Sequence, residues 1–298
     1  MSIVVCKLPK AGLGNQLFPL MKAYTFGYLN ELPVLVTGYH QVKIGPYLRG
    51  ERIKRNYNGF FNFQKNMLAA FLDEWHLRKH RTKMVLEPVV KSLPENEAAD
   101  TLYVFAAMPH WESYFEGLKE HRSIVIDLLE RLLSNNTQRA ISKLPPPCIG
   151  VHIRMGDFRK LRAGEDFNIV GIVRTPESYF IDIIQSIRRI HGTELPVSIF
   201  TDGFKQEFGE LLTLNNVQFI EGNSDLVDLL LLSKSKVIVT SATSTFSYWA
   251  GFLSDAILLM HPAHVGTVIR PLDMADQVYQ GAFDPDHPFL INSIRQII

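Results

Sequence analysis

The chain of 298 residues is long enough for two domains of ordinary size. Its 31 lysines and arginines balance 30 aspartates and glutamates, so we expect no nucleic-acid partner. Cys6 and Cys148 lie in separate apolar stretches and are expected to be buried thiols. The first residues do not resemble a signal peptide, and no apolar run reaches the roughly 18 residues of a membrane span. We therefore expect a cytoplasmic protein with at most peripheral membrane contact.

The first half of the chain predicts a strand–helix–strand unit. A strand over 4–8 is followed by a glycine turn, a helix over 15–30 and a second strand that begins at Pro33. Residues 40–80 are rich in aromatic and basic side chains without a clear period, which indicates loops and short helices around the mouth of a pocket. A further strand over 101–107 precedes helices that extend to about residue 143.

The run Pro145-Pro146-Pro147 predicts a domain boundary, with one domain over 1–145 and another over 146–298. The last helix of the second domain is expected to be able to pack back on the first domain. Apolar runs at 148–154, 197–202, 217–221, 236–242 and 256–261 predict strands that alternate with helices. The clearest of these helices has Thr175 as its N-cap, Pro176 as its first residue and Gly192 at its end. This order predicts an α/β domain with a largely parallel sheet, which binds ligands at the carboxyl ends of its strands.

The loop that follows the first strand contains Gly12 and Gly14, and a helix begins there with Asn15 and Gln16. Helix N-termini bind phosphates and sugar hydroxyls through their free N–H groups. The string is not G-x-G-x-x-G, however, and by itself an ordinary turn explains it better.

The strand over 148–154 carries His152 and Arg154 on one face, opposite Val151 and Ile153. A buried, unpaired guanidinium is unfavourable, so Arg154 requires an anion, and a diphosphate matches its two-pronged geometry. The alternative is an ion pair between Arg154 and Asp157 that stabilises the turn. We favour the ligand-binding interpretation over this alternative.

Two later strand ends also carry polar residues. Asp202 follows the strand over 197–202 and could reach a ribose or a base, or belong to a simple Asp-Gly turn. The stretch 240–252 is rich in serine and threonine at a strand-to-helix junction, which suits an anion. Its aromatic residues are better explained as core. Asp225 and Asp228 favour the start of the preceding helix, or alternatively reach a guanine edge.

Strings typical of a metal or a nucleotide triphosphate were not found: there is no H-E-x-x-H, no P-loop and no zinc spacing. The G-x-S-x-G string of hydrolases is also absent. We therefore expect no metal and no cofactor. If a diphosphate leaves at this site, arginine and helix dipoles must offset its charge.

Four strings in this order, AGLGNQLF at 11–18, VHIRMGDF at 151–158, DLLLLSKSK at 228–236 and ATSTFSYWAG at 242–251, resemble those of the α-1,2-fucosyltransferases of glycosyltransferase family 11. The resemblance covers most of the chain but not residues 40–110, where an acceptor would be bound. It implies a GT-B fold of two Rossmann-like domains that face a cleft, with the donor bound mainly by the C-terminal half. It also implies GDP-β-L-fucose as donor, inversion at the anomeric carbon and no metal.

The resemblance also implies roles for particular residues. Arg154 would pair with the β-phosphate, and His152 would support the same strand end. The resemblance does not name the general base, for which Asp157 and Glu177 are candidates by position only. The residues expected at the donor are Gly14, Asn15, Gln16, Arg154, Asp202, Asp225, Ser244, Thr245 and Phe246. The chain departs from the family pattern at Met155, where a second arginine is usual, and at Thr243 and Tyr248.

The implied reaction is fucosylation of the 2-hydroxyl of a terminal β-galactoside. In a bacterial cytosolic setting the acceptor would be a surface-polysaccharide repeat such as an O-antigen unit, carried by a lipid at the inner membrane face. The alternatives are a transferase for another GDP- or UDP-sugar and a non-catalytic protein that binds a nucleotide or a glycan. The basic and aromatic stretch 49–55 is better explained as a solvated loop than as a membrane contact.

Overall fold

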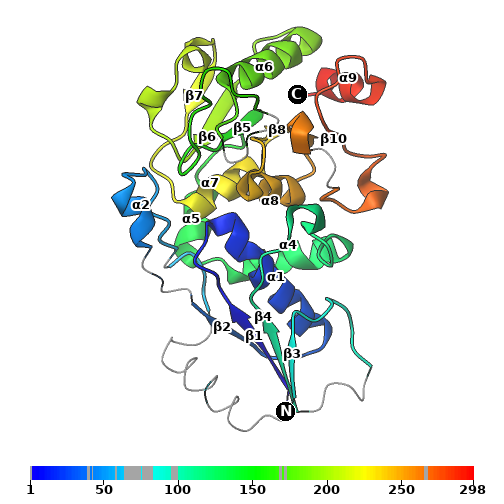
Figure 1. Cartoon of the computed structure of the whole chain (residues 1–298). Coiled ribbons are helices and arrows are strands. Elements are labelled where there is room, and N and C mark those ends of the chain that lie inside the picture. Colours follow the sequence, from blue (N-terminus) through cyan, green and yellow to red (C-terminus); the bar gives the residue numbers. More distant parts are fainter. Residues whose placement is uncertain are drawn as a thin grey trace. The chain divides into compact units, whose positions relative to one another are not determined.

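The computed structural model describes residues 2–38, 41, 43–57, 59–63, 75, 83–94, 100–167, 170, 173–264 and 268–298 (Figure 1). The chain forms two compact units. The first comprises Met1–Lys43 and Arg55–Arg139, and the second comprises Ile44–Lys54 and Ala140–Ile298.

The first unit is built on a parallel sheet in the order β2-β1-β4-β3. Its strands are β1 (Ile3–Lys7), β2 (Val34–Thr37), β3 (Lys83–Leu86) and β4 (Thr101–Phe105). Helix α1 (Leu13–Leu29) packs against β1, β2 and β4 (Figure 1). The remaining elements are η1 (Trp111–Ser113), η2 (Lys119–His121), α4 (Arg122–Leu132) and α5 (Asn135–Ser142), which spans the division between the units.

The close packing of α1 explains one of its glycines. A Cβ added at Gly27 would lie 2.5 Å from Cγ2 of Val34, so any side chain there would push the helix away from β2. The apolar residues Leu17, Leu20 and Met21 of the same helix are fully buried, as their spacing predicts. The strand–helix–strand unit expected from the sequence is therefore confirmed.

The second unit contains a six-stranded parallel sheet in the order β10-β9-β8-β5-β6-β7. Its strands are β5 (Ile149–Ile153), β6 (Val197–Thr201), β7 (Val217–Phe219), β8 (Val237–Val239), β9 (Ile257–Leu259) and β10 (Gln280–Gly281). Its helices are α2 (Ile44–Leu48), α6 (Glu177–His191), α7 (Asp225–Leu232), α8 (Thr245–Leu253) and α9 (Pro288–Arg295). Short 3₁₀ turns are η3 (Lys205–Glu207), η4 (Glu210–Thr213), η5 (Pro262–His264) and η6 (Leu272–Met274).

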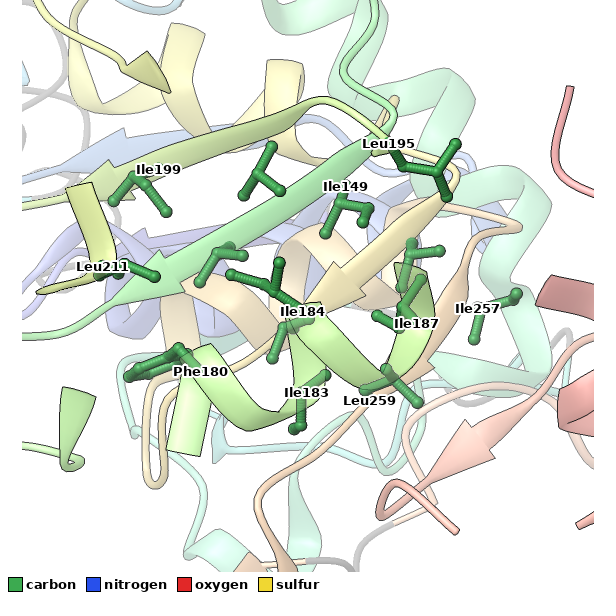
Figure 2. Close-up of a cluster of buried hydrophobic side chains, with 14 of the residues drawn as sticks. Ile149, Phe180, Ile183, Ile184, Ile187, Leu195, Ile199, Leu211, Ile257 and Leu259 are labelled. Atoms are coloured by element: carbon green, nitrogen blue, oxygen red, sulfur yellow. The ribbon is translucent and has the colours of Figure 1, made fainter. Parts of the chain in front are cut away.

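The main core of the second unit lies between α6 and the sheet. Figure 2 shows the apolar face of α6, which carries Phe180, Ile184 and Ile187, turned toward side chains of the strands. The helix ends at Gly192, whose φ of 88° lies in the left-handed region that favours glycine. The apolar period and the glycine stop predicted from the sequence are both confirmed.

Three expectations differ from the structure. Pro176, in extended conformation, is the N-cap of α6, and the hydroxyl of Thr175 instead accepts the N–H of Ala242 at 3.1 Å. The units divide at 139/140 rather than 145/146, and the segment 44–54 belongs to the second unit. Helix α9 packs on α6 of its own unit, because Leu290 and Ile294 enter the same core.

Two further expectations concern the segment 40–80 and the membrane. The prediction of loops and short helices over 40–80 agrees with α2, but residues 64–74 and 76–82 lie outside the described residues. Within the part of the chain that the structure describes, none of the helices combines the length and the apolar character that crossing a membrane requires.

Candidate active site

The strand order of the second unit places a switch point between β5 and β8. From β5 the chain continues to β6 on one side, whereas β8 and β9 lie on the other side. Loops leaving two such neighbouring strands diverge, and ligands of parallel α/β sheets bind in the crevice between them. Here these loops are residues 154–158 after β5 and 240–244 after β8, which are two of the four stretches that the sequence marked.

His152 lies in β5 and contacts residues of the junction between β8 and α8. Its ring is buried and stacks on Phe246 of α8 with a centroid distance of 4.6 Å, and its Nδ1 lies 3.3 Å from Oγ of Ser244. Burial lowers the pKa of His152 to about 3, with the nearby charge of Arg154 adding to that effect and Asp202 opposing it. The imidazole is therefore neutral at physiological pH and supports the β8–α8 junction rather than exchanging protons.

Arg154 follows β5 and is paired with two carboxylates. One guanidinium nitrogen donates to Asp202 and the other donates to Asp157. The ion pair with Asp157 that the sequence suggested as an alternative is thus present, and a second carboxylate accompanies it. The backbone N–H of Arg154 donates to Oγ of Ser241 at 2.9 Å, and that hydroxyl donates to the carbonyl of His152 at 2.9 Å.

The two carboxylates differ in how firmly they are held. Oδ1 of Asp202 also accepts the N–H groups of Met155 at 2.7 Å and Gly156 at 3.0 Å, so both of its oxygens are used within the protein. Asp157 is more exposed, at 37% against 14% for the side chain of Asp202. Asp202 therefore fixes the loop, instead of ending the strand with free oxygens for a ribose, and Asp157 is the more exposed of the two partners.

Met155 confirms the expected alternation of this segment. Its side chain is buried in the core on the far side of the strand end from the guanidinium of Arg154. A Cβ added at Gly203 would lie 2.4 Å from its sulfur, so this side of the loop is closely packed. Replacing the family's second arginine by methionine thus leaves Arg154 in place.

The loop after β8 leads directly into α8. Ser244 is the N-cap, but its side chain does not cap the helix and instead faces His152. Thr245 and Phe246 follow as partly exposed residues of the first turn, whose N–H groups have no helical acceptor. Tyr248 and Trp249 are buried in the core, as expected. The free N–H groups of this first turn are able to donate hydrogen bonds to an anion.

Helix α7 adds two carboxyl groups near the same edge of the sheet. Asp225 lies in its first turn, after the N-cap Ser224. Asp228 is buried and accepts a hydrogen bond from Nδ2 of Asn223 at 3.0 Å. Burial raises the pKa of Asp228 to about 6, an effect that the positive charge of Arg52 opposes.

Arg52 was not predicted as a site residue. It comes from the segment 44–54, and its guanidinium donates to the carbonyl of Thr201 at the end of β6. Its Cζ lies 5.8 Å from the ring centroid of Phe219, at the end of β7. The basic and aromatic composition of this stretch was the available signal, but composition alone did not indicate which strands it contacts.

The glycine turn predicted as a ligand site belongs to the first unit. Gln16 is buried, and its Nε2 donates to the carbonyl of Pro9 at 2.8 Å, so this amide holds the turn rather than standing free. Asn15 is partly exposed at the start of α1, and its side chain makes no hydrogen bond with the described residues. Gly14 is buried in the first turn of the helix.

The role expected of Glu177 needs a correction. Glu177, a candidate base by position, accepts the N–H groups of Gly209 at 3.1 Å and Leu211 at 2.7 Å, and so anchors the turn η4.

Sequence reasoning overlooked an acidic D-x-D triplet at Asp284 and Asp286. Both residues are exposed in a turn before α9, where Oδ1 of Asp284 accepts the N–H of Asp286 at 3.0 Å. Among the residues described, no group of three or more His, Cys, Asp or Glu side chains is placed to hold a metal ion.

Solved structures share this fold. A fucosyltransferase NodZ from Bradyrhizobium aligns with 89% of this chain and 97% of its own, at a TM-score of 0.54 and 14% identity. NodZ α-1,6-fucosyltransferase soaked with GDP-fucose aligns with 86% of this chain and 94% of its own, at a TM-score of 0.51 and 15% identity. The fold is therefore α/β of the GT-B type, with a Rossmann-like parallel sheet in each unit, as expected.

Sequence comparison gives the family. An α-1,2-colitosyltransferase of Escherichia coli is 25% identical over 300 residues, which cover 96% of this chain and 97% of the relative. The model of glycosyl transferase family 11 matches residues 6–264, a range that includes all four strings singled out in the sequence. The chain belongs to glycosyltransferase family 11.

Proposed function

We propose that this glycosyltransferase transfers L-fucose from GDP-β-L-fucose to the 2-hydroxyl of a terminal β-galactoside, with inversion and without a metal. The observation that carries the proposal is the guanidinium of Arg154 at the switch point, held between Asp202 and the more exposed Asp157. A guanidinium in this position suits the diphosphate of a sugar nucleotide, which it can bind through two parallel hydrogen bonds. The first turn of α8 supplies further N–H donors.

Support for the donor and the linkage comes from the relatives. A structure with the same fold was soaked with GDP-fucose, and the name of the Escherichia coli relative gives an α-1,2 linkage. Asp225 and Asp228 at the start of α7 offer carboxyl oxygens to the N–H groups of a guanine edge. An α-linked product from a β-linked donor requires inversion at the anomeric carbon.

The residues suggest the following course of reaction. The 2-hydroxyl oxygen of the acceptor forms a bond to C1 of fucose as the bond from C1 to the phosphate oxygen breaks, and GDP leaves with the electron pair. Arg154 stabilises the charge that develops on the departing diphosphate, an effect of the kind that changes rates by about 10²- to 10³-fold. The hydroxyl proton passes to a base, for which Asp157 is the candidate in this loop. His152 positions Ser244 and Phe246 and remains neutral.

A second candidate donor follows from the same relative. Its name assigns colitose to that enzyme, so a nucleotide-activated colitose, or another GDP- or UDP-sugar, is the alternative donor for this chain. The acceptor setting that we propose is a surface-polysaccharide repeat of O-antigen type, carried on a lipid at the cytoplasmic face of a membrane that the protein contacts peripherally. A non-catalytic nucleotide- or glycan-binding protein is the alternative from another class.

The test is to measure GDP release from GDP-fucose, with and without a panel of β-galactosides, in the presence of EDTA. Release that depends on acceptor and persists in chelator supports the proposal, and the linkage of the product is then read by NMR. Release from a colitose or UDP-sugar donor instead would overturn the choice of donor. Binding of GDP without turnover on any acceptor would favour the non-catalytic alternative.

A further inference from the structure

Arg52 and Arg154 make hydrogen bonds to consecutive residues at the end of one strand. Arg52 donates to the carbonyl of Thr201, and Arg154 donates to the carboxylate of the next residue, Asp202. Consecutive Cα atoms are about 3.8 Å apart, so both cations border the same turn at the carboxyl end of β6. This end of a parallel sheet is the side on which ligands bind.

The two cations differ in how their charges are balanced. Arg154 has two carboxylate partners, whereas Arg52 has a neutral carbonyl as its hydrogen-bond acceptor. No described carboxylate lies within ion-pair distance of Arg52, and its Nε is buried without an acceptor among the described residues. A partly buried guanidinium without a counter-ion is unfavourable unless an anion binds there.

The segment that carries Arg52 is held in a defined shape. The buried Glu51 donates its N–H to the carbonyl of Pro46 at 2.9 Å and accepts a hydrogen bond from Nε of Arg49 at 2.6 Å. The ring of Phe219 borders the guanidinium on the side of β7. Arg52 thus belongs to a loop whose shape is fixed by hydrogen bonds, and its side chain packs against Phe219 instead of extending freely into solvent.

Charge balance at this edge of the sheet indicates what Arg52 binds. Arg154 is shared by Asp157 and Asp202, and Asp225 and Asp228 add further carboxyl groups at the start of α7. A diphosphate that bound beside Arg154 alone would meet a surplus of negative charge. Arg52 supplies positive charge that no described carboxylate holds in an ion pair, although Asp228 lies near enough for this charge to lower its pKa.

We propose that Arg52 is a second donor-binding cation, which contacts the diphosphate of the nucleotide-activated sugar together with Arg154. This inference rests on the proposed function in that it takes a sugar nucleotide as the donor, but it does not depend on the base or the sugar. It adds a specificity for diphosphate to the site and assigns a residue from the N-terminal half of the sequence to donor binding.

The test measures the affinity of the full chain for GDP, for inorganic pyrophosphate and for guanosine, which carries no phosphate. Arg52→Ala is expected to weaken GDP and pyrophosphate binding by about 10- to 100-fold, the range for a charge-assisted hydrogen bond, and to change guanosine binding by less than about 3-fold. Arg52→Lys keeps the charge and should recover part of the loss. The matched control is Arg131→Ala, which removes an exposed arginine that is paired with the exposed Asp127 on α4.

Two results would overturn the inference. In one, Arg52→Ala binds GDP as tightly as the wild type and Arg131→Ala do. In the other, Arg52→Ala loses GDP and guanosine by the same factor, which is the mark of a structural role. If the wild type binds UDP instead of GDP, the proposed donor fails and Arg52 is tested with UDP against uridine. If the wild type binds no nucleoside diphosphate, both proposals fall.

Discussion

The turn after β1 and the loop after β5 each follow an internal strand of a parallel sheet, and each contains a glycine, Gly12 in the turn and Gly156 in the loop. Different groups hold the two connections in place. After β1, the neutral amides of Gln16 and Gln41 donate to the carbonyls of Pro9 and Leu8. After β5, a guanidinium is shared by two carboxylates, one of which also fixes two backbone N–H groups. Polar residues after a strand therefore do not by themselves indicate a ligand site. The second junction differs because it holds a guanidinium, an ionic group that suits a diphosphate in the proposed function.

Removing the guanidinium of Arg154 is the most direct test of this difference between the two connections. We expect Arg154→Ala to lower kcat/KM by about 10²- to 10³-fold, because the departing diphosphate loses its charge-assisted contact. The measurement is steady-state GDP release with the β-galactoside of the proposed panel that supports the fastest release. Arg159→Ala is the control, since Arg159 is exposed and paired with Glu165 a few residues further on. Near-normal turnover of Arg154→Ala would show that the loop after β5 is as structural as the turn after β1.

Asp228 of α7 allows a measurement of how unfavourable a buried negative charge is at this edge of the sheet. Its carboxyl pKa is raised from 3.8 to about 6 by burial, so protonation favours the folded state. That contribution is fully present below about pH 4 and is lost as the pH rises through about 6. Asp228→Asn should therefore stabilise the protein above pH 6, by up to about 3 kcal/mol, and have no such effect near pH 4.

The measurement for Asp228 is urea unfolding of both proteins at pH 4 and at pH 7.5. Asn at this position retains an oxygen that can accept the hydrogen bond of Asn223, so the comparison isolates the charge. A stability difference that does not change between the two pH values would contradict the assigned titration.

The glycines of the two junctions allow a matched comparison. A Cβ at Gly156 would lie 2.3 Å from Oδ2 of Asp202, whereas a Cβ at Gly12 would meet nothing within 4 Å. We expect Gly156→Ala to weaken GDP binding by about 10-fold or more, because the carboxylate that positions Arg154 must move. Gly12→Ala should change stability by no more than about 0.5 kcal/mol. Calorimetric titration and thermal unfolding of both variants test this, and equal behaviour of the two would remove the distinction.

The smallest expected effect concerns the turn after β1. Gln16→Leu removes the hydrogen bond to Pro9 and is expected to lower the free energy of unfolding by about 1 kcal/mol, with GDP affinity unchanged. Asn15→Ala, at the neighbouring and more exposed position, should leave the stability almost unchanged. Urea unfolding and GDP titration of the pair distinguish a structural amide from a ligand-binding one. A large loss of GDP affinity in Gln16→Leu would assign the turn to the donor site.

The parts of the site that local pattern determines were predictable. Alternation along β5 placed His152 and Arg154 on one face and Met155 in the core, because side chains alternate along a strand wherever it occurs. The helical period of α6 and its glycine stop were predictable for the same reason. Strand order in the sheet then brings the loops after β5 and β8 together.

The choice of partners could not be predicted from the sequence. Asp202 is 48 positions from Arg154, and its second oxygen fixes the backbone of residues 155 and 156. Glu177 was a candidate base by position, but its carboxylate anchors η4. Hydrogen bonds of this kind depend on which side chains the finished fold brings within reach, and neither spacing nor composition carries that information.

The segment 44–54 has a consequence for how the chain reaches its folded state. The hydrogen bond from Arg52 to Thr201 joins residues that are 149 positions apart, and a contact over such a separation closes a long loop late and slowly. During synthesis, Arg52 emerges well before β5 and β6 exist. The sheet of the second unit can nevertheless be complete before Arg52 binds at its edge, because this long loop closes slowly. We expect refolding to show a slower phase in which diphosphate affinity appears after the signal of the sheet.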